Sequence, residues 1–185
     1  MTLNLELFQL INGISGHVVY LDKLMIFIAK YSPLLYAFLL ITQWLFRGDD
    51  GKRASINAVF AGILALGFNL LISTIYFEPR PFVNHKDNLL IKHPADASFP
   101  SDHASGGSAF AFTELIYDKI FGKIMMILTL LLLFARVYVG VHYPIDVLGG
   151  FLIGYISSRV IKKFNQIFNP LEVFIIKIWH KIFVF

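Results

Sequence analysis

Long apolar runs dominate the chain, and short polar segments separate them. Crossing about 30 Å of hydrocarbon takes roughly 20 mainly apolar residues in a helix. Four runs meet this requirement and predict membrane-spanning helices over residues 24–46, 54–77, 124–141 and 145–161. A fifth run, residues 102–117, is shorter and rich in Ala, Ser and Gly. Small residues let helices pack closely inside a bilayer, so this run predicts a buried central helix.

The two ends of the chain mix polar with apolar residues. Residues 1–20 carry Asn, Glu, Gln and His among apolar side chains, and residues 171–185 carry Lys and His among aromatic ones. Such segments favour helices that lie in the membrane interface. Near the end of the central helix, Glu114 is expected to reach the interface. We predict that the whole chain, residues 1–185, is one all-α polytopic membrane bundle of about five to six transmembrane helices.

The composition agrees with a membrane protein. The chain is 57% hydrophobic and only 15% charged, whereas a typical soluble domain carries about 25% charged residues. Aromatic residues make up 16%, which excludes intrinsic disorder. Cysteine is absent, so a disulfide framework and thiolate metal sites are excluded too.

Most basic residues fall on one side of the membrane if five helices alternate in direction. Cytoplasmic loops are enriched in Lys and Arg, so we predict that this side is the cytoplasm. The net charge of +4 does not indicate a nucleic-acid binder, because these charges are scattered in short loops. The residues on this side are Arg47, Lys52, Arg53, Lys119, Lys123, Arg159, Lys162, Lys163, Lys177 and Lys181.

Two arginines on the opposite side lie close to the predicted hydrocarbon. A charge in that position needs a partner or a function, and an anionic ligand would supply one for Arg80 and Arg136. Proline residues on both sides of Arg80 stiffen its segment. Ser101 is a plausible N-cap of the central helix, whose first turn carries His103. A helix N-terminus binds anions through its free N–H groups and its dipole.

A third cluster consists of Arg136, His142 and Asp146. Pro144 suits the first position of the last predicted helix, which puts Asp146 near the third. From there its carboxylate can reach back to the His142 imidazole. Such a hydrogen bond selects one tautomer and leaves the other ring nitrogen free as a nucleophile.

Isolated histidines are more often surface or capping residues than functional ones. We apply that interpretation to His17, His85, His93 and His180. A metal site is the competing hypothesis for the histidine and aspartate cluster. Two neighbouring arginines would repel a cation, and the spacing of a zinc-binding helix motif is absent. The pattern therefore predicts a phosphate site that uses no metal or other cofactor.

These motifs resemble the signature of the type 2 phosphatidic acid phosphatase superfamily. Its pattern is Arg-Pro, Pro-Ser-x-His and Arg-x5-His-x3-Asp, and all three occur here in that order. The surrounding runs, residues 76–82, 95–103 and 139–149, resemble the bacitracin-resistance type of undecaprenyl-diphosphatase.

The resemblance implies a role for each motif residue. It implies three catalytic residues. His142 would be the nucleophile that forms a phosphohistidine, His103 the general acid and then the base, and Asp146 the partner of His142. It implies Arg80, Ser101 and Arg136 as the groups that bind the substrate phosphate.

The chain departs from the family pattern at three positions. Ser73 stands where many relatives have a lysine, Asp102 where they often have glycine, and Ala135 where serine is common. Lys86 or Lys92 could replace the missing lysine.

The predicted function is hydrolysis of undecaprenyl diphosphate to the monophosphate and phosphate, which recycles the lipid carrier of bacterial peptidoglycan synthesis. The protein is expected in the plasma membrane with its active site on the extracytoplasmic side, and it would contribute to bacitracin resistance. Its expected partners are the polyprenyl diphosphate and membrane lipids, with no nucleic acid and no obligate protein partner.

Two alternatives remain. One is a phosphatase for phosphatidic acid or phosphatidylglycerophosphate. The other is a small lipid transporter or flippase, although transporters usually carry ionisable groups near the midplane and show repeated halves.

Overall fold

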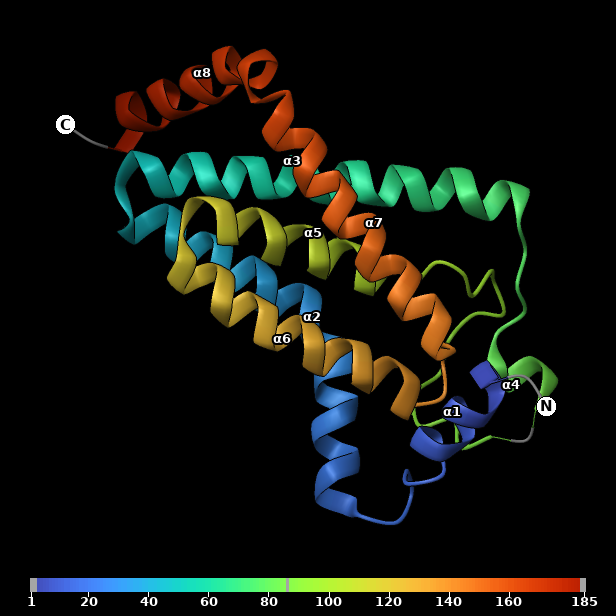
Figure 1. Cartoon of the computed structure of the whole chain (residues 1–185). Coiled ribbons are helices and arrows are strands. Elements are labelled where there is room, and N and C mark those ends of the chain that lie inside the picture. The colour runs from blue at the N-terminus through green and yellow to red at the C-terminus, as the bar shows by residue number, and fades with distance from the viewer. Residues whose placement is uncertain (1–2, 86, 184–185) are drawn as a thin grey trace.

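The computed structural model describes residues 3–85 and 87–183, which fold into eight helices without a strand (Figure 1). Four of these helices are long and apolar enough to cross a membrane, namely α2, α3, α6 and α7. The predicted all-α membrane bundle is therefore confirmed. The helices are α1 (Leu3–Asn12), α2 (Val19–Phe46), α3 (Gly48–Ile75), α4 (Pro81–Asn84), α5 (Asp102–Tyr117), α6 (Lys119–Tyr138), α7 (Pro144–Lys163) and α8 (Asn165–Phe183).

Helix α5 lies at the centre of the bundle and packs against α3, α6 and α7 (Figure 1). Its small residues make this close packing possible, and glycines on α7 match them. A Cβ atom on Gly154 would lie 2.5 Å from the carbonyl oxygen of Ser105. The prediction of a buried central helix is thus confirmed. The prediction for Glu114 is wrong, because its side chain is fully buried and accepts a 2.6 Å hydrogen bond from Gln43 of α2.

The helix ends differ from the predicted ones in ways that the local sequence explains. Helix α6 ends at Tyr138, three residues early, because Gly140 adopts a left-handed φ of 85° that a helix cannot continue through. The chain from Val139 to Tyr143 becomes a loop that carries His142. Helix α3 begins at Gly48, earlier than predicted, and two aspartates in its first turn suit the positive end of the helix dipole.

The terminal segments also differ from the prediction. Residues 1–20 do not form a single helix, since α1 ends at Asn12 and α2 begins at Val19. The Asn12 side chain donates hydrogen bonds to the carbonyls of Tyr138 and Asn88, at 2.9 and 3.0 Å, and this ties α1 to two distant segments. Helix α8 starts six residues before the predicted 171. The interfacial location of both segments stays a prediction.

The bundle has two distinct ends. The segment between α3 and α5, the loop between α6 and α7, and α1 gather at one end (Figure 1). The connections α2–α3, α5–α6 and α7–α8 lie at the other. Helix α2 changes direction part-way along its length and contains Pro33, the usual cause of such a kink (Figure 1). All three predicted motif clusters consequently meet at the first end.

Candidate active site

His142 lies at the centre of a buried cluster at this end of the bundle, with only 2% of its surface exposed. Its Nε2 atom lies 3.2 Å from Nη1 of Arg80 and 3.3 Å from Nη2 of Arg136. A guanidinium group can only donate hydrogen bonds. Nη1 of Arg80 also lies 3.4 Å from Nδ1, but the two shorter contacts favour Nε2 as the acceptor nitrogen. The neutral ring then carries its proton on Nδ1. The arginines therefore select the tautomer whose lone pair lies on Nε2.

Both arginines are held by backbone carbonyls. Arg80 donates from Nη1 to Val141 at 2.9 Å and from Nη2 to Ala97 at 3.2 Å, and its Nε forms a 2.7 Å ion pair with Asp96. Arg136 donates from Nη1 to the carbonyl of Ala29 at 3.3 Å. These contacts orient two nearly buried cations toward the same imidazole. The arrangement suits an anion that would lie between them.

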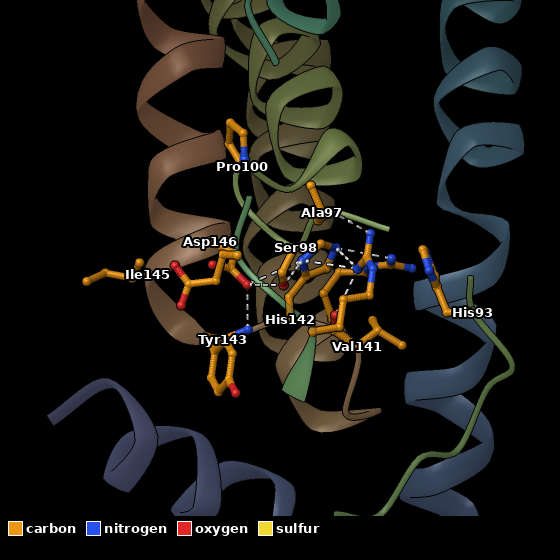
Figure 2. A network of polar contacts seen from close by, with 12 residues as sticks. His93, Ala97, Ser98, Pro100, Val141, His142, Tyr143, Ile145 and Asp146 are labelled. Atoms are coloured by element: carbon orange, nitrogen blue, oxygen red, sulfur yellow. Dashed lines mark hydrogen bonds and ion pairs between the residues drawn. The ribbon is translucent and has the colours of Figure 1, made fainter. Parts of the chain in front are cut away.

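Asp146 lies behind the His142 ring, at the third position of α7, with Pro144 at the start of that helix as predicted. Its Oδ2 atom is 3.5 Å from Nδ1 of His142, which is longer than an ordinary hydrogen bond. The same oxygen accepts hydrogen bonds from the Ser98 hydroxyl at 2.5 Å and from the backbone N–H of Tyr143 at 2.8 Å. Figure 2 shows Ser98 beside both Asp146 and His142.

The Ser98 hydroxyl links the carboxylate to the imidazole. Its single proton goes to Asp146, so its lone pairs remain for the Nδ1–H group of His142, 3.4 Å away. Ser98 is fully buried and its own N–H donates to the carbonyl of Glu78 at 2.8 Å. The ring is therefore oriented by a serine and an aspartate together.

Burial lowers the pKa of His142 well below its usual value, and the positive charges of Arg136 and Arg80 lower it further. Each of these effects disfavours the protonated ring. His142 is consequently neutral at physiological pH, which is the state that a nucleophilic imidazole requires.

A cavity of about 320 Å³ opens in front of this cluster. His103, in the first turn of α5, contributes to its wall. The first N–H groups of α5 have no acceptor within their own helix, which adds positive potential on this side. The cavity is lined by Leu66, Asn69, Leu70, Ser73, Arg80, His93, Asp96, Ala97, Phe99, Pro100, Asp102, His103, Arg136 and His142.

Four of the six predicted site residues line the cavity, namely Arg80, His103, Arg136 and His142. Asp146 lies behind the ring. Ser101 precedes α5 as expected for an N-cap, but it is fully buried and does not line the cavity. Its hydroxyl has no hydrogen-bond partner among the described residues.

The structure places one of the two lysines that could replace the missing family lysine. Lys92 is exposed and does not line the cavity, whereas Lys86 falls outside the described residues. Ser73 does line the cavity, at the position where many relatives have lysine.

Two residues of the site were missed by sequence reasoning. His93, which we interpret from the sequence as a surface or capping residue, has a ring that lines the cavity, with its centroid 6.3 Å from that of His142. Ser98 carries no signal beyond its place in the run of residues 95–103. Both residues lie in an irregular segment, where the path of the chain sets the direction of each side chain. The helical periodicity of the sequence carries no information about that path.

The residues described by the structure include no group of three or more His, Asp or Glu side chains that could hold a metal ion. The positive groups around His142 instead suit an anionic ligand.

The chain is similar to known proteins over most of its length. Residues 54–169 match the model of the PAP2 superfamily. The chain is 39% identical to undecaprenyl-diphosphatase BcrC of Bacillus subtilis, over 97% of this chain and 93% of that one. It is 34% identical to an undecaprenyl-diphosphatase of Sulfolobus acidocaldarius, over 88% and 83% of the two chains. Among solved structures, Aquifex aeolicus LpxE is 30% identical and superposes with a TM-score of 0.74, covering 88% of this chain and 96% of that one.

Proposed function

The chain belongs to the PAP2 superfamily, and from this premise we propose that it is an undecaprenyl-diphosphate phosphatase of the membrane. The relatives from Bacillus subtilis and Sulfolobus acidocaldarius, which share most of its length, carry that activity in their names. The observation that carries the proposal is the neutral Nε2 atom of His142, which faces a cavity between two arginines. A nucleophile placed between two fixed cations suits attack on a phosphoryl group.

In the first step, Nε2 of His142 attacks the terminal phosphorus. A P–N bond forms and the bond from phosphorus to the bridging oxygen breaks, which releases undecaprenyl phosphate. His103, which gains a proton as the anionic substrate binds, gives that proton to the departing oxygen. In the second step His103 takes a proton from water, the resulting hydroxide attacks the phosphohistidine, and the P–N bond breaks to release inorganic phosphate.

Arg80 and Arg136 neutralise the charge on the phosphoryl oxygens during both steps. They leave Nε2 for these oxygens when substrate binds, which frees the lone pair for attack. Asp146 and Ser98 act as positioning residues, because they touch only the far side of the ring. Ser101 would reach a phosphate only if its buried hydroxyl turned toward the cavity.

An apolar groove beside the site fits the lipid tail. It has a volume of about 260 Å³ and lies between α2, α3 and α5, next to the Pro33 kink. It shares Leu66, Asp102 and His103 with the wall of the catalytic cavity. A polyprenyl chain in this groove would hold its headgroup at His142 while the rest of the tail stays in the bilayer.

The distribution of basic residues supports an orientation with the active site outside the cell. The basic end of the bundle is opposite to the cavity, and positive ends stay in the cytoplasm. In that orientation the enzyme would recycle the carrier lipid of peptidoglycan synthesis where it is released. Its overproduction would also raise resistance to bacitracin.

The direct test uses the purified protein in detergent with EDTA. It is offered undecaprenyl diphosphate, phosphatidic acid and phosphatidylglycerophosphate in parallel, and phosphate release is measured. We expect undecaprenyl diphosphate to have the highest kcat/KM. A higher value for either glycerolipid would assign the other substrate class, and no release from any of the three would refute the enzyme.

A further inference from the structure

His93 lies in the catalytic cavity although it belongs to none of the three motifs. It comes from the long segment between α3 and α5, and its side chain is 18% exposed. Figure 2 shows His93 and Asp146 on opposite sides of His142. The two rings stand edge to face, with their centroids 6.3 Å apart. His93 thus faces the nucleophile from the cavity, whereas Asp146 supports it from behind.

The contacts of His93 determine which ring nitrogen is available. Its Nδ1 atom lies 3.1 Å from the carbonyl oxygen of Pro94, which can only accept a hydrogen bond. Nδ1 therefore carries a proton in either charge state, and Nε2 is the atom free for a ligand. Asp96 lies 3.7 Å from Nδ1 and also pairs with Arg80. Burial and the positive charges of Arg80 and Arg136 lower the pKa of His93, and Asp96 offsets only part of this effect. The ring is therefore neutral in the free site and gains its second proton when an anion binds at Nε2.

The charges around the cavity indicate what a positive charge on His93 could bind. Two arginines and two aspartates line it, namely Arg80, Arg136, Asp96 and Asp102, so these formal charges cancel while the histidines are neutral. A lipid with one phosphate group has little need of further cations, because both arginines already face His142. A diphosphate brings a second anionic group, and burying it without a partner is costly. Protonated His93 would supply that partner.

We propose that His93 is a specificity-determining residue, which binds the lipid-linked phosphate of a diphosphate substrate while Arg80 and Arg136 bind the terminal one. This assignment rests on the proposed function. The separation of the two rings is on the scale of a diphosphate rather than of one hydrogen bond, so both histidines can contact one headgroup. A monophosphate that lies against His142 would leave His93 unused.

The test compares two tail-free anions, inorganic pyrophosphate and inorganic phosphate. Their binding to the full-length protein and to His93→Ala is measured by titration calorimetry in detergent. Loss of a charge-assisted hydrogen bond should weaken pyrophosphate about tenfold or more, and phosphate less than about twofold. In assays with undecaprenyl diphosphate, KM should rise by a similar factor while kcat changes little. Equal losses for both anions, or no loss for either, would overturn the proposal.

Two further variants control the test. Lys92→Ala removes a charge from the exposed neighbouring residue and should leave both affinities unchanged. If His93→Ala does not fold, His93→Gln gives the same comparison, and it should still weaken pyrophosphate more than phosphate. The binding assay needs no turnover. A protein that selects pyrophosphate through His93 but releases no phosphate from any lipid would refute the proposed function and retain this assignment.

Discussion

The bundle buries polar clusters at both of its ends, and the two ends differ in what the polar groups face. At the end away from the cavity, Glu172 of α8 accepts hydrogen bonds from Asn57 at 3.1 Å and from Asn165 at 3.3 Å. Asn165 also donates to Tyr117 at 2.9 Å. In this cluster, which we call the Glu172 cluster, carboxylate and amide groups bond to one another and join α8 to α3.

The cluster around His142 is built differently. Its two guanidinium groups face the same neutral ring, and a cavity lies in front of them. Like charges side by side are unfavourable unless an anion joins them. Buried polarity by itself therefore does not identify the active site of this protein. The distinguishing feature is that two guanidinium groups and a neutral imidazole meet at the wall of a cavity.

The largest expected effect on activity comes from a substitution in the His142 cluster. His142→Ala removes the nucleophile and should lower kcat by about 10³-fold or more, because the covalent route is lost. Phosphate release from undecaprenyl diphosphate measures this. Quenched wild-type reactions with labelled substrate should contain protein-bound phosphate, and His142→Ala should contain none. A variant with wild-type turnover would contradict the mechanism.

Ser98→Ala should have a smaller effect, about tenfold on kcat/KM. The hydroxyl orients Asp146 and the ring but does not reach the cavity, and such supporting contacts typically contribute about 10- to 100-fold. Ser157→Ala on α7 is a matched control, since Ser157 is also fully buried but has no hydrogen-bond partner among the described residues. Similar activities for the two variants would show that Ser98 only packs.

Protonation of His142 should cause little loss of activity near neutral pH, whereas a nucleophilic histidine with the usual pKa would lose much of its activity there. Protonation inactivates the nucleophile, and burial together with Arg136 and Arg80 lowers the pKa of His142. Activity therefore falls only when the pH drops below this lowered pKa. Between pH 7.5 and 6, protonation of His142 should therefore lower kcat/KM less than about twofold once the titrations of the substrate and of His103 are divided out. An acidic limb centred at or above about pH 6.5 would contradict the lowered pKa.

The Glu172 cluster should affect stability but not chemistry. Glu172→Ala leaves the buried amides of Asn57 and Asn165 with fewer partners, which costs about 1–3 kcal/mol of folding free energy. Thermal unfolding in detergent should show a lower midpoint. The kcat/KM per folded molecule should stay within about twofold of wild type. A large loss of turnover at full folding would indicate that the two ends of the bundle are coupled.

Much of the site was predictable because its residues belong to short motifs at helix ends. Pro144 and Asp146 occupy the predicted first turn of α7, and Arg136 lies in the last turn of α6. A regular helix carries such residues to one end of the bundle wherever the spans alternate. Ser98 and His93 were not predictable in this way, since both lie in an irregular segment whose course depends on contacts with distant residues.

The sequence by itself determined the helical class, the order of the spans, the central position of α5 and the meeting of the three motifs at one end. These properties follow from the length, apolar content and small-residue pattern of local segments. Only the tertiary structure decided that Glu114 is buried against Gln43, that Ser101 lies outside the cavity wall and that His93 lies within it. The physical reason is that the direction of a side chain in a loop, or at a contact between helices, is set by atoms that lie far away in the sequence.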